Sequence, residues 1–139
     1  MKYLLTFLIF VLLMMSCDAN KTITKDSNVN LGVENDTIRI ANDDLEYEIL
    51  IIDPGFNSFI LTQPPRGHYG LTYLENKNRN FVLEYNNRAR NPQQFDFNLY
   101  PQAIDYNYGT SYGYEVNYML YNYFRFFMQK YNQKFPGGR

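Results

Sequence analysis

The chain has 139 residues and a net charge of −1, which suits one domain with a single hydrophobic core. This balance argues against a nucleic-acid partner, because phosphate binding needs a clustered positive surface. The single cysteine excludes a disulfide within the chain, and neither composition nor motif indicates a cofactor.

The N-terminus has the layout of a bacterial lipoprotein leader. Lys2 precedes an apolar run from Tyr3 to Met15, and the small residue Ser16 stands directly before Cys17. This order is that of a secretory signal, and the run is shorter than the roughly 20 apolar residues that cross a bilayer. We therefore predict a cleaved signal peptide at residues 1–16.

Cleavage before Cys17 would make its thiol the first side chain of the mature protein, ready to carry a diacylglyceryl thioether, with a palmitate-type acyl chain on the new amine. Several acyl chains anchor a protein stably, whereas one binds only marginally. The prediction is a lipid-anchored membrane protein of the cell envelope, on the periplasmic face or the cell surface. The polar residues 17–36 comprise this cysteine and a flexible tether.

Residues 37–52 have the alternation of two β-strands. Ile38 and Ile40 alternate with polar neighbours, and a second run extends from Leu45 to Ile52. The second half of that run is apolar on both sides, which is typical of a strand in a covered core. Asp53 and Pro54 then have the chemistry of a helix start.

Residues 69–89 have helical composition, and a cluster of asparagines at 76, 78 and 80 predicts a division into two helices. Pro92 ends the second of these. The alternation in Phe95–Tyr100 allows a short strand or an extended loop. The final helix, Tyr114–Tyr131, has a buried stripe at helical spacing. Its members are Val116, Leu120, Phe124, Phe127, Met128 and Tyr131.

These elements predict a small single α+β domain at residues 37–135, followed by a disordered tail at 136–139. A short sheet of two or three strands packs against several helices, of which the C-terminal one is long.

Five polar residues stand in otherwise apolar segments and form the candidate site. They are Asn86, Arg88, Asp105, Glu115 and Asn117. If Arg88 is partly buried it needs a carboxylate, and Asp105 and Glu115 are the candidates. The group is either a structural network or a ligand pocket. The tyrosine-rich loop 100–114 is a second candidate surface, for a glycan or a small ligand, with Asp105 and Asn107 as hydrogen-bonding partners.

Enzymatic function has little support in the sequence. Residues 109–113 match G-x-S-x-G, but the single histidine, His68, precedes the serine, and the chain is too short for the hydrolase fold that uses this motif. An enzyme would need His68 or Arg88 to meet Asp105 or Glu115 in a pocket. One histidine and one acylated cysteine do not make a zinc site, so no metal is expected.

Several segments together resemble a known family. They are Tyr47–Phe56, Leu74–Asn78, Asn86–Arg88, Ile104–Tyr106 and Tyr112–Tyr123. The chain resembles a family of short, uncharacterised lipoproteins from Bacteroidota, most specifically over Tyr112–Tyr118. This resemblance implies a domain of unknown function and transfers no mechanism. The leading expectation is a non-catalytic interaction or accessory module that meets envelope proteins or glycans.

Overall fold

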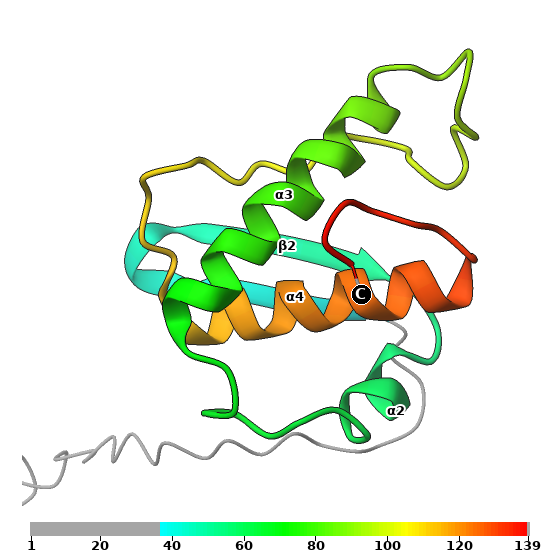
Figure 1. The fold of residues 1–139 in the computed structure, drawn as a ribbon. Coiled ribbons are helices and arrows are strands. Elements are labelled where there is room, and N and C mark those ends of the chain that lie inside the picture. Colours follow the sequence, from blue (N-terminus) through cyan, green and yellow to red (C-terminus); the bar gives the residue numbers. More distant parts are fainter. Residues whose placement is uncertain (1–36, 139) are drawn as a thin grey trace, which may run out of the picture. The chain divides into compact units, whose positions relative to one another are not determined.

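The computed structural model describes residues 37–138, which belong to one compact unit. Figure 1 shows its elements. In chain order they are β1 (Thr37–Asn42), η1 (Asp43–Leu45), β2 (Tyr47–Ile52), α2 (Phe56–Ile60), α3 (Leu71–Ala89) and α4 (Gly113–Lys130). The small α+β fold with a long C-terminal helix is confirmed. The predicted signal peptide, Cys17 and the tether lie outside the described residues.

β1 and β2 form an antiparallel hairpin, with Thr37 opposite Ile52 and Asn42 opposite Tyr47. The connection is the short 3-10 helix η1, whose first turn is capped because the Asn42 side chain accepts a hydrogen bond from the N–H of Leu45. Glu46 follows in the left-handed conformation, at φ 51°, and redirects the chain. The second strand therefore begins at Tyr47, not at Leu45 as predicted.

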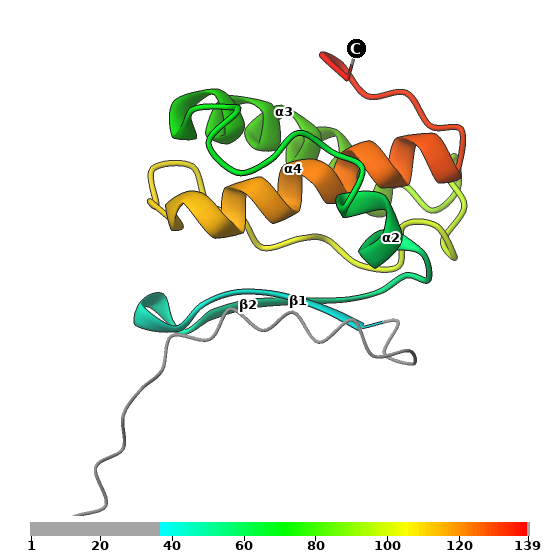
Figure 2. The same ribbon diagram turned by 90° about the horizontal axis from the view of Figure 1, so that it is seen from below.

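The hairpin forms one layer and the helices form the other, as Figure 2 shows. Ile40 and Ile51 on the inner face are buried, whereas Leu50 and Ile52 on the outer face are 62% and 78% exposed. The expectation that β2 is covered on both sides is thus wrong. Among residues 37–138 the sheet has only one helical layer to pack on, so its outer apolar side chains face solvent.

α4 is the central helix, in contact with β1, α2 and α3. The core that it shares with α3 is rich in aromatic rings, including Phe81, Phe124 and Phe127. α3 is one continuous helix, which corrects the predicted division. Asn78 does not break it because its buried amide donates to the backbone oxygen and to Oδ1 of Asn117 on α4.

The remaining segments differ from the sequence prediction in detail. α2 begins at Phe56, with Gly55 as its N-cap at φ 96°, a value that suits glycine. Residues 95–100 form turns. The chain beyond α4 packs back onto the domain, where Phe135 is buried. Gly137 lies in the segment 136–139 that was expected to be a disordered tail, and its carbonyl oxygen accepts a hydrogen bond from Lys77 at 2.6 Å.

Candidate functional site

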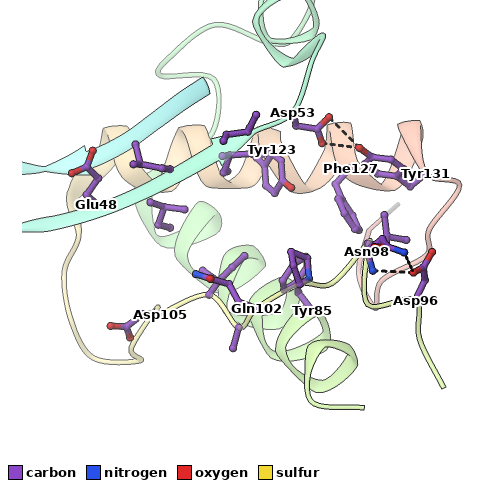
Figure 3. A pocket seen from close by; sticks show the side chains of 18 residues that line it. Glu48, Asp53, Tyr85, Asp96, Asn98, Gln102, Asp105, Tyr123, Phe127 and Tyr131 are labelled. Carbon is purple, nitrogen blue, oxygen red and sulfur yellow. Dashed lines mark hydrogen bonds between the residues drawn. The ribbon is translucent and has the colours of Figure 1, made fainter. Parts of the chain in front are cut away.

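A groove of about 920 Å³ runs along β2. Residues 48–53 form one wall, and the segment Asp96–Asp105 forms the opposite wall (Figure 3). The floor includes Tyr85 of α3 and both Tyr123 and Phe127 of α4. Consecutive strand residues point to opposite faces of a sheet, so a wall made of every residue from 48 to 53 is the edge of the strand.

This edge of β2 has no partner strand among the described residues. β1 pairs along the other edge, and the backbone hydrogen bonds within residues 37–138 include none from the groove side of β2. An unpaired edge presents N–H and C=O groups that can pair with another strand. The wall therefore offers both donors and acceptors to a ligand.

The opposite wall is held in place by three side chains from different elements. The Asn86 amide donates to the carbonyl oxygen of Ile104 at 2.8 Å and accepts from its N–H at 2.7 Å. The Tyr47 hydroxyl donates to the carbonyl oxygen of Asp105 at 2.6 Å. The Tyr106 hydroxyl donates to Oδ1 of Asn117 at 2.7 Å. α3, β2 and α4 thus all fix the position of this loop.

An ion pair closes one end of the groove. Nζ of Lys130 donates to Oδ1 of the buried Asp53 at 2.5 Å, and the Tyr131 hydroxyl donates to the same oxygen at 3.1 Å. The hydrogen bond to Asp53 raises the pKa of Lys130, which keeps the ammonium group charged. In Figure 3, Asp53 and Tyr131 lie at this end, while Glu48 and Asp105 lie at the other.

The groove is acidic. Its lining includes four carboxylates, and no lysine, arginine or histidine among the described residues lines it. The carboxylates are Glu48, Asp53, Asp96 and Asp105. Glu48 accepts from Nε of Arg39 at 2.8 Å. Asp96 and Asp105 take part in no ion pair within the part of the chain that the structure describes, so their charge is uncompensated there.

The floor of the groove is neutral and apolar. Burial raises the pKa of Tyr85 to about 12 and also raises the pKa of Tyr123. Both phenols are therefore uncharged at neutral pH. With Phe127 and with Ile104 of the loop, they provide the hydrophobic surface on which a ligand can pack.

The five polar residues of the sequence prediction do not meet in one pocket. Asp105 lines the groove, Asn86 positions its wall, and Asn117 is buried in the core beneath the loop. Glu115 lies elsewhere, in an exposed ion pair with Arg66. The set therefore includes one lining residue and two residues that position the loop.

The expectation that Arg88 pairs with Asp105 or Glu115 is wrong. Arg88 pairs with Glu84, one helical turn earlier, at 2.7 Å. Its guanidinium also donates to the Tyr100 hydroxyl at 2.9 Å and to the carbonyl oxygen of Lys134 at 2.8 Å. Arg88 thus ties the C-terminal segment to α3, behind the loop that forms the groove wall.

A family model matches almost all of the chain, over residues 4–138. Its description is Family of unknown function (DUF6146). The chain belongs to this family. Comparisons with curated proteins and with solved structures found no match. The expectation of an uncharacterised domain is confirmed. The family description names no activity that could be assigned to the groove.

The residues that an enzyme would need share no hydrogen bond in the described part of this DUF6146 domain. His68 is exposed in a turn, against the ring of Tyr69, and no hydrogen bond among residues 37–138 joins it to Asp105 or Glu115. Within the same range, no three His, Cys, Asp or Glu side chains are grouped to hold a metal ion. None of the helices described there is long and apolar enough to cross a membrane.

The tyrosine-rich loop is mostly turned inward. Tyr100 and Tyr112 are buried, and Tyr106 is half-buried with its hydroxyl bonded to Asn117. Tyr108 is 76% exposed, but the guanidinium carbon of Arg79 lies 3.6 Å from its ring centroid. Sequence reasoning found this loop through its composition, whereas the free edge of β2 and the role of Asp53 were missed.

Proposed function

We propose that this DUF6146 protein is a lipid-anchored, non-catalytic binding module of the cell envelope, and that its ligand lies in the groove along β2. The observation that supports this most directly is the composition of the groove. An open strand edge, a neutral aromatic floor and two uncompensated carboxylates lie together in one cavity. Ligand sites typically combine such an apolar surface with a few polar groups.

The proposed anchor is supported by the order of residues 2–17. The family match begins at residue 4, so the N-terminal part is shared with the family and is not peculiar to this chain. Cys17→Ser is expected to abolish labelling by a palmitate analogue and to release the protein from membranes. Ser27→Ala, in the same polar segment, is the matched control and should remain labelled. Unchanged labelling of Cys17→Ser would refute the anchor.

The proposed binding site is tested by photo-cross-linking in the cells that make the protein. Gln102 is exposed and lines the groove, so a benzoylphenylalanine there lies beside the ligand. Gln94 is also exposed but lies outside the groove, and serves as the control position. We expect a cross-linked species from position 102 that position 94 does not give. The same products from both positions would contradict binding in the groove.

A glycan ligand is the alternative. The inward orientation of Tyr100 and Tyr112 gives little support to a stacking surface on the loop 100–114. A glycan in the β2 groove instead would contact Tyr85 on the floor and the side chains of Asn98 and Gln102 on the wall. Sugar residues cross-linked at position 102 would favour this alternative over a protein ligand.

A further inference from the structure

We propose that the groove binds an extended, basic segment of another protein, which adds to β2 as a third strand. This inference rests on the proposed binding role of the groove and specifies the chemistry of the ligand. Its central observation is that consecutive residues 48–53 all line the groove while β1 pairs with β2 on one side, which places the other edge of β2 at the groove. Another strand is the ligand whose backbone spacing matches such an edge along its whole length.

The opposite wall is not paired with β2 among the described residues. Ile104 faces β2 across the groove, but both its N–H and its C=O are bonded to the Asn86 amide of α3. Its single N–H donor is therefore not available to β2. Tyr47 holds the next residue, Asp105, by its carbonyl oxygen. The loop is fixed beside the edge without pairing to it, so the groove stays open between them.

The size of the groove suits a short strand. β2 has 6 residues, which extend about 20 Å at the usual rise of a strand. Alternate side chains of an added strand would point toward the floor, where Tyr85 and Phe127 offer apolar surface. The intervening side chains would point to solvent beside the exposed Leu50 and Ile52. The expected segment thus has apolar residues at every second position.

The charge of the groove selects basic segments. Asp105 at one end and Asp96 at the other lack cationic partners among the described residues, whereas Glu48 is paired with Arg39. Lysine or arginine near the ends of the segment would complement these charges. An acidic segment would bring like charges together.

The same charges argue against a second copy of this chain as the occupant. Antiparallel pairing of two β2 edges would bring the carboxylates of both copies into one narrow space. Each copy would contribute Asp96 and Asp105 from the loop, which form no ion pair among the described residues. Such like-charge contacts oppose association, so we assign the site to a different protein.

Selection from a random library of synthetic peptides, each about seven residues long, tests the proposal with the full-length chain in detergent micelles. We expect enrichment of lysine or arginine near the ends and of apolar residues at alternate positions. The enriched peptide is then N-methylated at one residue at a time. Methylation should weaken binding about tenfold or more at every second residue, where an N–H faces β2, and little at the others.

A charge variant gives an independent check. Gln102→Lys places a cation in the groove at an exposed position and should weaken binding of the enriched peptide about threefold at low salt. Gln94→Lys, outside the groove, should leave binding unchanged. The proposal would be overturned if no peptide is enriched or if acidic peptides are enriched. It would also be overturned if the effects of N-methylation do not recur at every second residue. If position 102 nevertheless cross-links a glycan in cells, the binding groove remains and only the peptide ligand is excluded.

Discussion

Lys130, in the last turn of α4, forms an ion pair with Asp53, the residue that follows β2. Nζ of Lys130 also donates to the carbonyl oxygen of Pro54 at 2.8 Å, so the lysine holds the chain where it leaves the strand. Asp53 is buried, whereas the Lys130 side chain is 33% exposed. This pair joins the sheet to the central helix and closes one end of the groove.

Lys130→Met is expected to lower the free energy of unfolding by about 1–3 kcal/mol, because among residues 37–138 the variant leaves the buried carboxylate with only the Tyr131 hydroxyl as a partner. Partial exposure of the lysine keeps the loss below that of a fully buried pair. Urea denaturation measures the effect. Lys134→Met is the matched control, since Lys134 is exposed. Equal unfolding midpoints for both variants would show that the ion pair contributes nothing.

Arg88→Lys is expected to lower the free energy of unfolding by about 2 kcal/mol, although the charge is kept. A lysine cannot reach Glu84, Tyr100 and the backbone of Lys134 at once, whereas the planar guanidinium does. Arg79→Lys is the control, because Arg79 is exposed and a lysine still places a cation near Tyr108. Similar losses for the two variants would refute the special role of Arg88.

The elements that the sequence predicted well are those defined by short-range patterns. The alternation around Ile38 and Ile40 and the apolar run ending at Ile52 gave the two strands, within a few residues. The stripe in the last helix is buried as expected, from Val116 to Met128. Both patterns arise from the period of a single element, which needs no knowledge of the partner. The stripe does not show that α4 is buried on its other sides too, where Asn117, Tyr121 and Asn122 lie.

The groove could not be predicted because it depends on contacts between distant parts of the chain. Asp53 has the chemistry of an N-cap when read locally, and its real partner is 77 residues away. Tyr47 reaches Asp105 across 58 residues. The apolar residues on both sides of β2 suggested a covered strand, but exposed Leu50 and Ile52 belong to a sheet packed on one face. A single sequence does not distinguish these cases.

Asn117→Leu and Asn122→Leu are expected to have different effects on stability, although both asparagines are buried on α4. Oδ1 of Asn117 accepts hydrogen bonds from Asn78 and from the Tyr106 hydroxyl. Asn117→Leu should lower the free energy of unfolding by about 2–4 kcal/mol and loosen the groove wall, because both buried donors lose their acceptor.

Oδ1 of Asn122, by contrast, has no hydrogen-bonding partner among the described residues, and its Nδ2 donates only to the carbonyl oxygen of Tyr118. Asn122→Leu should leave stability unchanged or raise it by about 1 kcal/mol, since an apolar side chain of similar size replaces an unsatisfied acceptor. Thermal unfolding of the two variants gives the comparison. A clear loss for Asn122→Leu would show that this oxygen has a partner in solution.

The protein is expected to lose stability steeply in alkaline solution. Burial raises the pKa of Tyr85 and of Tyr106 to about 12 in the folded state, against about 10 for a phenol in the unfolded chain. The folded state therefore binds these protons more tightly than the unfolded state. The stabilisation that these two neutral phenols give the folded state is fully present below about pH 10 and is lost as the pH rises toward 12. The Lys130–Asp53 pair acts in the same direction, because the pKa of Lys130 is also raised.

Tyr85→Phe isolates one of these contributions. No hydrogen bond among residues 37–138 uses the Tyr85 hydroxyl, so the substitution removes an ionisable group and keeps the aromatic packing against Tyr100 and Phe127. Between about pH 10 and pH 12, the free energy of unfolding should fall less steeply for the variant than for the wild-type protein. Tyr106→Phe is not equivalent, because it also removes a hydrogen bond to Asn117. Identical slopes for Tyr85→Phe and wild type would show that the Tyr85 phenol ionises as easily in the folded state as in the unfolded one.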